Sequence, residues 1–331
     1  MNKILTISVA AYNVASYINN CLDSLCVSEI IKDIEVFVVD DGATDDTLKI
    51  AKEYEKKYPF SFHVVHKENG GYGSTVNYSI KHATGKYFKL LDGDDWYDSD
   101  ELVKLIKMLK KTDSDIVVTN YKTGPDKSGL KIIDYYSNEK PGVKKLSGFI
   151  PVRYFGMWAM VVKTKVLRDC KLTLPEHELY TDQYFCTYPL AYAKTIQFVN
   201  CCVYCYRTER DGQSMSKESR IKHYKVTLTH AIKLTKFCAS QEGKPNYPII
   251  LKRVSGYHSG AINTLLLKPI SKKSLNEIKM HERKIKTISK DVFNEAVKAG
   301  ETGRLLWIMR HTGYLSYWLI MPVLKRLINR M

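Results

Sequence analysis

"KLLDGDDWYDSDEL", residues 89–102, places the carboxylates of Asp92, Asp94 and Asp95 directly behind a short apolar run. Carboxylates that are buried beside a strand are costly unless a cation neutralises them. A positive charge is therefore expected close to this group, and the segments on either side of it indicate which one.

Apolar runs typical of buried strands alternate with amphipathic segments typical of helices around this stretch. Strands are expected at residues 4–12, 34–42, 60–68, 86–92 and 114–121, and helices at 14–25, 45–58, 73–84 and 99–111. Thr44 or Asp45 is the expected N-cap of the second helix, and Gly85 is expected to close the third. This alternation predicts the α/β class, with a mostly parallel sheet that carries helices on both faces.

Acidic residues end two of these predicted strands. Asp40 and Asp41 end the second strand, and Asp92 and Asp94 end the fourth. Ligands of such sheets bind beyond the carboxyl ends of the strands, and Mg²⁺ and Mn²⁺ take carboxylate and phosphate oxygens as ligands. The two acidic ends therefore indicate a nucleotide with a divalent cation at its phosphates, which supplies the expected positive charge.

Other interpretations of the acidic stretch are possible. An EF-hand loop would need an acid or Asn near Trp96 and a Gly after it, and neither is present. "DDWYD" (94–98) matches the DDxxD of isoprenoid synthases, but that motif belongs to an all-helical surround and this one follows a strand. A solvated turn with a helix cap fits Asp98, Ser99 and Asp100, and is also an alternative for Asp92 and Asp94.

Four motifs in order resemble the inverting glycosyltransferases of family 2, which have the Rossmann-like GT-A fold. They are "AAYNVASYINNCLDSL" (10–25), "VVDDGATDDT" (38–47), "KENGGYGSTVNYSIKHATGKYFKLLDGDDW" (67–96) and "YTDQYF" (180–185). The resemblance covers roughly residues 3–215. It implies a GT-A domain, sugar transfer from a nucleotide sugar with inversion, and Mn²⁺ or Mg²⁺ as cofactor.

The resemblance also implies roles for single residues in the nucleotide pocket. Ala10 and Tyr12 would line it, with the Tyr12 ring stacked on uracil. Asp41 would accept a hydrogen bond from uracil N3, and Asp40 would support Asp41. Strand-end packing is the alternative for Tyr12, and capping of the next helix is the alternative for Asp40.

For the reacting groups, the resemblance implies that Asp92 lies near the ribose and the metal. Asp94 would be the principal metal ligand, and Asp182 the general base that takes the proton of the acceptor hydroxyl. The chain departs from the family at this motif, because Thr181 precedes Asp182 where members usually have Glu. Thr181, Glu178 or His177 would have to replace that Glu, and capping of the helix expected at 182–193 is the alternative for Asp182.

A later segment, "YRTERDGQSMSK" (206–217), resembles the Tyr-Arg…Gly-Ser segment that follows the base in the family. Arg207 or Arg210 would neutralise the diphosphate, and Ser214 or Ser216 would contact it as part of a closing loop. A solvated polar loop explains these residues equally well.

Three further features bear weakly on function. Trp158 is a candidate for stacking on a sugar or an acceptor, and a buried core Trp is the alternative. "GGYGSTVN" (70–77) lacks the Lys-Ser/Thr of a P-loop and predicts a tight turn into a helix. Cys202 and Cys205 form a lone CxxC without a second pair, so zinc is not expected, and the eight scattered cysteines are interpreted as reduced packing residues.

The net charge of +16 is concentrated in the last third of the chain. Residues 220–331 contain 22 Lys and Arg and 6 Asp and Glu, whereas residues 1–219 contain 29 of each. Long helical patterns begin at the same place, so we expect a catalytic domain at 1–218 and a basic helical region at 219–331. The positive charge indicates an anionic partner.

The C-terminal stretch "GRLLWIMRHTGYLSYWLIMPVLKRLINRM" (303–331) interleaves aromatic and aliphatic residues with Lys and Arg. This mixture is typical of the membrane interface, where aromatic rings and basic residues meet anionic lipid. A solvated helical tail and an oligomer interface are alternatives, and no RNA-binding motif accompanies the charge. No apolar run is long enough to span a membrane, and the N-terminus lacks the cleavage site of a secretory signal.

Together these features and the resemblance predict an inverting, metal-dependent glycosyltransferase that uses a nucleotide sugar, with a UDP-sugar as the favoured donor, and acts on a hydroxyl of a lipid-linked or cell-envelope glycan. We expect it in the cytoplasm, peripheral on the inner face of the cell membrane. The alternative within enzymes is a protein O-glycosyltransferase or a soluble oligosaccharide-extending enzyme. The alternative from another class is a non-catalytic protein that binds an anionic polymer.

Overall fold

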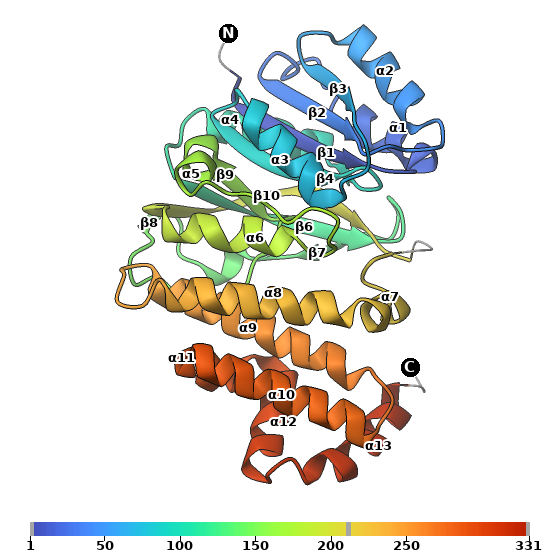
Figure 1. The fold of residues 1–331 in the computed structure, drawn as a ribbon. Coiled ribbons are helices and arrows are strands. Elements are labelled where there is room, and N and C mark those ends of the chain that lie inside the picture. The colour runs from blue at the N-terminus through green and yellow to red at the C-terminus, as the bar shows by residue number, and fades with distance from the viewer. Residues whose placement is uncertain (1–2, 210–212, 329–331) are drawn as a thin grey trace. The chain divides into compact units, whose positions relative to one another are not determined.

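A computed structural model describes residues 3–209 and 213–328 (Figure 1). The chain divides into two compact units, Met1–Asp211 and Gly212–Met331. The domain boundary predicted from the sequence, between residues 218 and 219, lies seven residues after this one. Of the helices described, none is long and apolar enough to cross a membrane.

The first unit is built on a ten-stranded mixed sheet with the strand order β3-β2-β1-β4-β9-β6-β10-β5, in which β7 pairs with β6 and β8 with β10. The strands are β1 (Leu5–Ala11), β2 (Ile34–Asp40), β3 (Phe62–His66), β4 (Tyr87–Asp92), β5 (Trp96–Tyr97), β6 (Ile116–Gly124), β7 (Lys131–Ile133), β8 (Val143–Lys145), β9 (Met160–Lys163) and β10 (Thr195–Arg207). Strands β3, β2, β1 and β4 are parallel, as predicted. Strand β9 then lies antiparallel between β4 and β6, so the second half of the sheet is mixed.

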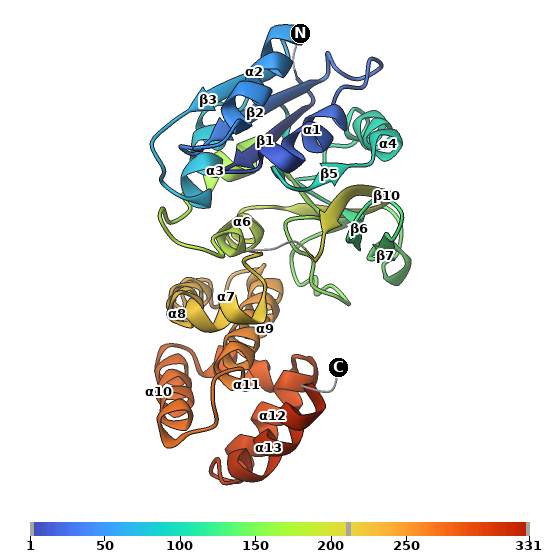
Figure 2. The same cartoon turned by 90° about the vertical axis from the view of Figure 1, so that its right-hand side faces the viewer.

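Helices cover both faces of this sheet (Figures 1 and 2). They are α1 (Ala15–Asp23), α2 (Thr47–Lys57), α3 (Tyr72–His82), α4 (Ser99–Leu109), α5 (Thr164–Asp169) and α6 (Asp182–Thr187), with 3₁₀ turns at Tyr136–Asn138 and Tyr188–Ala191. Helix α1 packs with α2, whereas α3 packs with α5 and over β1 and β2. Right-handed crossovers explain this division, because the chain reverses direction across the sheet after β3.

The strands of the parallel half are buried on both faces, which explains their continuous apolar sequence. In β2 all seven residues are buried, and in β1 six of the seven. Helix α4 begins where the sequence predicts, because the Asp98 carboxylate caps it and accepts the amide hydrogen bond of Glu101.

Two local predictions are corrected. Gly85 closes no helix, because α3 ends at His82; a Cβ on Gly85 would lie 2.5 Å from the amide nitrogen of Thr6, so glycine is needed there for close approach to β1. The N-cap residue of α2 is Asp46. The Asp45 carboxylate instead accepts the amide hydrogen bonds of Thr47 and Ala15 and thereby ties the starts of α2 and α1 together.

The second unit is helical: α7 (Lys217–Lys222), α8 (Tyr224–Ala239), α9 (Tyr247–Leu266), α10 (Lys272–Ile288), α11 (Lys290–Glu295), a 3₁₀ turn (Ala296–Lys298), α12 (Gly300–His311) and α13 (Ser316–Ile328). One apolar core joins α9, α10, α12 and α13. Helix α10 was not singled out from the sequence, because two of its buried positions are His281 and Glu282, which interrupt the apolar stripe of Leu275 and Ile278.

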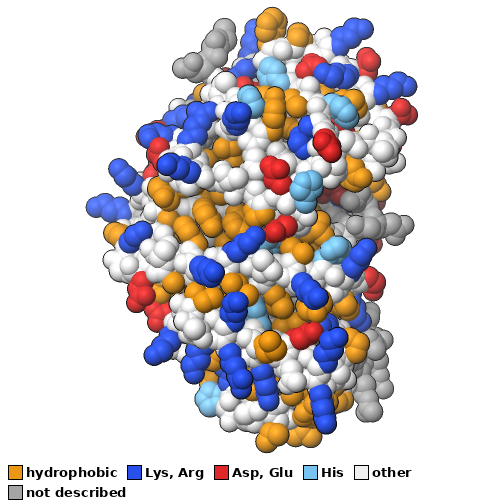
Figure 3. Space-filling view, in the orientation of Figure 1, with side chains coloured by type: hydrophobic (Ala, Val, Ile, Leu, Met, Phe, Trp, Pro, Cys, Tyr) orange, Lys and Arg blue, Asp and Glu red, His pale blue; other side chains and the backbone are white. Residues whose placement is uncertain are grey.

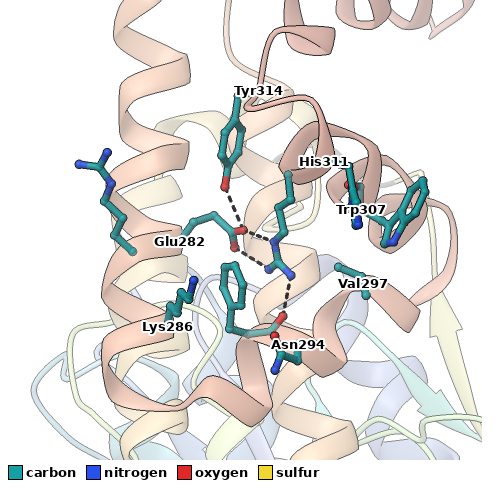
Figure 4. A pocket seen from close by; sticks show the side chains of 10 residues that line it. Glu282, Lys286, Asn294, Val297, Trp307, His311 and Tyr314 are labelled. Carbon is teal, nitrogen blue, oxygen red and sulfur yellow. Dashed lines mark hydrogen bonds and ion pairs between the residues drawn. The ribbon is translucent and has the colours of Figure 1, made fainter.

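The second unit also contains a buried ionic network beside a cavity of about 460 Å³ (Figure 4). The Glu282 carboxylate accepts hydrogen bonds from Arg310 Nε at 2.6 Å and from Tyr314, and lies 2.6 Å from His258 Nε2. Arg310 also donates to the carbonyl of Phe293 at 2.8 Å. Each charge of this network is therefore paired, as buried charges require.

The predicted fold class is confirmed: an α/β domain of GT-A type is followed by a helical region. All eight cysteines are free thiols, and seven of them are buried.

Candidate active site

The carboxyl ends of β1, β2 and β4 meet at one edge of the sheet. In the strand register Ala10 pairs with Asp92, and Ala11 pairs with Asp40. The Gly93 amide donates to the Ala10 carbonyl at 3.0 Å, and a Cβ on Gly93 would lie 2.9 Å from that oxygen. The loop after β4 therefore lies directly on the end of β1, as only glycine permits.

Three carboxylates gather in this loop. Oxygens of Asp92, Asp94 and Asp95 all lie within 4.8 Å of one another. Asp95 is 1% exposed and accepts hydrogen bonds from the Tyr204 hydroxyl at 2.6 Å and from the Arg207 amide at 2.7 Å. Burial, followed by the charges of Asp92 and Asp94, holds the pKa of Asp95 well above its usual range.

The composition of this cluster fits a hard divalent cation. It offers only carboxylate oxygens, the donors that Mg²⁺ and Mn²⁺ prefer. The same three charges, after burial, also raise the pKa of the Cys21 thiol. The residues present therefore fit the metal that the acidic stretch predicts, with Asp95 as a third member. Its position directly after Asp94 in "GDD" could have indicated a third carboxylate of the metal site.

Arg207 lies at this cluster. Its Nε donates to the Asp94 carbonyl at 2.9 Å, and its guanidinium lies 4.8 Å from the centre of the Trp96 ring and 5.1 Å from that of Tyr17. The structure thus brings Arg207 and Asp94 together. The contact of Arg207 with a diphosphate stays a prediction.

Asp41 organises the loop before α3. One of its carboxylate oxygens accepts hydrogen bonds from Lys67 Nζ at 2.7 Å and the Gly70 amide at 2.9 Å, and the other accepts from the Gly71 amide at 2.7 Å. Asp41 is buried. Its carboxylate therefore holds the glycine turn of "NGG" against the end of β2, whichever ligand it also contacts.

The other residues predicted for the nucleotide pocket lie at the same edge. The Asp40 side chain is fully buried, and one of its oxygens lies 2.5 Å from His66 Nδ1. Ala10 is partly exposed at the end of β1, and the Tyr12 side chain just beyond it is 51% exposed. Core packing does not explain a ring as open as that of Tyr12.

The segment that carries Asp182 is pressed against the first turn of α3. The His177 amide donates to the Gly70 carbonyl at 2.6 Å, and a Cβ on Gly73 would lie 2.0 Å from the Pro175 carbonyl oxygen. His177 and Tyr180 have φ angles of 56° and 61°, in the left-handed region that is rare for residues other than glycine. Such backbone persists only where surrounding contacts enforce it.

Asp182 is the first residue of α6, after the N-cap residue Thr181, so it does not occupy the capping position. Its carboxylate accepts a hydrogen bond from Gln183 Nε2 at 2.7 Å. Thr181 is fully buried, and among the described residues its hydroxyl has no hydrogen-bond partner. Thr181 therefore does not present a polar group in place of the family's Glu.

Tyr72 connects the acidic cluster with Asp182. Burial, followed by the charges of Asp92 and Asp182, raises the pKa of its hydroxyl well above the usual range, so both carboxylates lie near this side chain. Met157 Sδ lies 3.3 Å from the same hydroxyl. The predicted metal side and the predicted base thus share one tyrosine, although they are 90 residues apart in the sequence. Sequence reasoning missed Tyr72, because nothing local marks it.

Trp158 forms part of an aromatic stack. Its ring centre lies 5.3 Å from that of Tyr121 and 5.1 Å from that of Tyr206. Its carbonyl accepts a hydrogen bond at 2.6 Å from Lys89 Nζ, and burial lowers the pKa of this lysine to about 7. The rings of Tyr121 and Tyr206 therefore pack against the Trp158 indole. Stacking of Trp158 on a sugar stays a prediction. The lone Lys in the apolar run "KYFKLLD" was a signal for this contact.

The remaining predicted contacts lie elsewhere. Ser216 is the N-cap of α7 and accepts the Ser219 amide hydrogen bond at 3.1 Å, and Ser214 is exposed. Both belong to the second unit, so their contact with a diphosphate stays a prediction. Arg210 lies outside the described residues.

Comparisons with known proteins identify the family. The model of Glycosyl transferase family 2 matches residues 6–165. An uncharacterised glycosyltransferase of Mycoplasma pneumoniae is 30% identical over 231 residues, which are 68% of this chain and 75% of that protein. The chain belongs to glycosyl transferase family 2. It is therefore a glycosyltransferase that uses a nucleotide sugar, and the predicted family is confirmed.

Two solved glycosyltransferase structures are similar to this chain over most of its length. The crystal structure of residues 1–349 of Staphylococcus aureus TarS with UDP-GlcNAc has a TM-score of 0.64 at 21% identity and covers 90% of each chain. The full TarS sequence, a poly(ribitol-phosphate) β-N-acetylglucosaminyltransferase, is 28% identical over 213 residues, and the match spans 36% of its length. A Pyrobaculum calidifontis mannosyltransferase with GDP-Man and Mn²⁺ has a TM-score of 0.54 at 17% identity, over 90% of this chain and 87% of that one. These likenesses show the fold of this family 2 chain.

Proposed function

We propose that this glycosyltransferase is metal-dependent and inverting, and that it moves a sugar from a UDP-sugar to a hydroxyl of a cell-envelope polymer. One observation carries the proposal: Asp92, a member of the Asp92–Asp94–Asp95 cluster, and Asp182 both lie near Tyr72, whose pKa their charges raise. A transferase of this kind needs positive charge at the leaving diphosphate and a base near the acceptor, within the length of one sugar.

The nucleotide is assigned to the edge formed by β1 and β2. The half-exposed Tyr12 ring offers a face for uracil, and Ala10 leaves room beside it. Asp41, supported by Asp40, accepts from N3 of the base in addition to its contacts with the glycine turn. UDP is favoured because TarS, the more similar of the two solved proteins, is described with UDP-GlcNAc.

Asp182 is the proposed general base. It takes the proton of the acceptor hydroxyl while that oxygen forms a bond to the anomeric carbon. The bond from this carbon to the diphosphate oxygen breaks on the opposite face, and the diphosphate leaves with the electron pair. One displacement inverts the anomeric centre, so no nucleophilic side chain is required.

Asp94 and Asp92 are the proposed ligands of Mn²⁺ or Mg²⁺, and Asp95 is the third carboxylate of the proposed site. When bound, the cation supplies positive charge at the diphosphate oxygens. The related mannosyltransferase described with Mn²⁺ supports this assignment. The Tyr204 hydroxyl and the Arg207 amide hold Asp95 in place.

The acceptor is proposed from charge and from the relatives. TarS acts on a poly(ribitol phosphate) by its name, and the basic second unit of this chain suits an anionic or membrane-linked polymer. The cytoplasmic side of the cell membrane is the proposed location of the enzyme. A protein O-glycosyltransferase or a soluble oligosaccharide-extending enzyme is the alternative, and it would act on a water-soluble acceptor without membranes.

Release of nucleoside diphosphate from a panel of UDP- and GDP-sugars, with Mn²⁺ or Mg²⁺, tests the proposal. We expect turnover of a UDP-sugar, and loss of about 10²- to 10⁴-fold in Asp182→Asn, with UDP binding retained. Asp169→Asn is the matched control, because this exposed carboxylate pairs with Lys165 on the surface of α5. Equal turnover in Asp182→Asn and the control would exclude Asp182 as the base. If no donor were turned over even by the wild type, a non-catalytic polymer-binding protein would be favoured.

A further inference from the structure

Helix α13 presents apolar side chains on two opposite sides. Tyr317 and Met321 point into the core of the second unit. On the other side lie Leu319, which is 76% exposed, and the likewise exposed Trp318 and Val323. A helix that only packs against its own unit would carry polar residues there.

The exposed apolar side continues beyond α13. Leu315, just before the helix, is 74% exposed, and Trp307 and Ile308 of α12 are exposed as well. We call Ile308, Leu315, Trp318, Leu319 and Val323 the C-terminal apolar face. Exposed apolar residues that recur at helical spacing mark an interaction surface, whereas single ones are ordinary.

The unit that carries this face is strongly basic. Arg304 is exposed one turn before Ile308 on α12, and His311 follows Ile308 by three residues. Residues 212–331 contain 23 Lys and Arg against 7 Asp and Glu. Figure 3 shows hydrophobic side chains at the lower end of the view, where Figure 1 draws the C-terminal helices, among many Lys and Arg. A second copy of this chain is a less suitable partner for the face, because the positive charges of the two second units would repel each other.

We infer that the C-terminal apolar face docks on an anionic membrane surface. Its Leu, Trp and Val side chains enter the boundary between headgroups and acyl chains, where Trp is favoured. The Lys and Arg side chains around it meet lipid phosphates. None of the described helices can span a bilayer, so the attachment is to one leaflet. The inference does not depend on the transfer reaction, because it concerns only the second unit.

Vesicle binding without donor or acceptor tests the inference. The full chain is mixed with vesicles of phosphatidylglycerol and phosphatidylcholine, or of phosphatidylcholine alone, and the bound fraction is measured by flotation. Trp fluorescence gives a second readout, because Trp307 and Trp318 are exposed whereas Trp96 is buried. We expect binding and a blue shift of the emission with the anionic vesicles, and at least tenfold weaker binding to phosphatidylcholine alone.

The variant Leu315→Ser/Leu319→Ser removes two apolar contacts and should weaken anionic-vesicle binding by about tenfold or more. Phe60→Ser/Ile132→Ser is the matched control, since these two residues are equally exposed in the first unit, and its binding should stay unchanged. Equal binding of both variants would overturn the inference. So would a wild-type chain that ignores anionic vesicles and forms dimers that Leu315→Ser/Leu319→Ser dissociates.

Discussion

Asp94 and Asp98 are four residues apart in one loop, and their surroundings differ. Asp94 shares its surroundings with two other carboxylates. The Asp98 carboxylate caps α4 through the Glu101 amide at 3.1 Å and pairs with Lys122 Nζ at 2.6 Å. The same residue type thus caps a helix and pairs with a lysine at one position, and lies among other carboxylates at the other.

Asparagine at each position separates the two roles. Asp94→Asn should lower the rate of sugar transfer by about 10²- to 10³-fold and raise the Mn²⁺ concentration that gives half-maximal rate. Asp98→Asn should leave the rate within a few-fold and lower the free energy of unfolding by about 1 kcal/mol, because only a cap and one ion pair are changed. Steady-state kinetics under Mn²⁺ titration and thermal unfolding measure these effects; similar kinetics for both variants would remove Asp94 from the metal site.

At the scale of elements, the first turn of α3 positions the segment before α6. The Asn77 side chain holds Leu174 through both its amide group and its carbonyl, at 2.9 and 2.8 Å. Gly73 lets the Pro175 carbonyl approach the helix closely. Through these contacts α3 holds the segment that leads to Asp182.

Gly73→Ala tests this coupling. The added methyl group would lie 2.0 Å from the Pro175 carbonyl oxygen, so the segment has to move. We expect transfer to fall by at least about tenfold and stability by about 1–3 kcal/mol. Gly260→Ala is the control: nothing lies within 4 Å of the added methyl in α9, and alanine should stabilise that helix by up to about 1 kcal/mol. A Gly73→Ala enzyme with full kcat would show that Asp182 is positioned independently of α3.

At the scale of the whole molecule, acid sensitivity is expected from the polar core of the second unit. Burial and the neighbouring His258, opposed by Glu282, lower the pKa of His281 to about 3. Among the described residues its Nε2 has no hydrogen-bond partner. For Glu282, burial would raise the pKa, but the hydrogen bonds from His258 and Arg310 outweigh it and lower the pKa to about 2.

The lowered pKa of His281 makes the free energy of unfolding depend on pH. Between about pH 6.5 and pH 3 the unfolded chain binds a proton at this position that the folded chain does not, so the free energy of unfolding falls as pH falls through this window, by up to about 1.4 kcal/mol per pH unit. The contribution of Glu282 is lost only below about pH 4.5. Thermal unfolding from pH 7.5 to 5 should therefore show a smaller loss in His281→Leu than in wild type. His311→Leu, at an exposed position, should follow the wild type; parallel curves for all three proteins would contradict the assignment.

The sequence by itself determined the alternation of strands and helices and the acids at the strand ends. Hydrophobic periodicity is local, and Asp40, Asp41, Asp92 and Asp94 follow apolar runs directly. The parallel strands β1 to β4 and the start of α4 could be predicted for that reason. The positive charge of the second unit could also be predicted, because it follows from the numbers of Lys, Arg, Asp and Glu in the sequence.

Tertiary structure alone decided how these parts meet. The antiparallel β9 enters the sheet between β4 and β6, which both lie far from it in the sequence. Tyr72 lies near both Asp92 and Asp182, which belong to different segments of the chain. The buried polar groups of Asp95 and Lys89 have partners that are 109 and 69 residues away in the sequence. Desolvation makes those distant partners obligatory, and no local pattern records which residue will supply them.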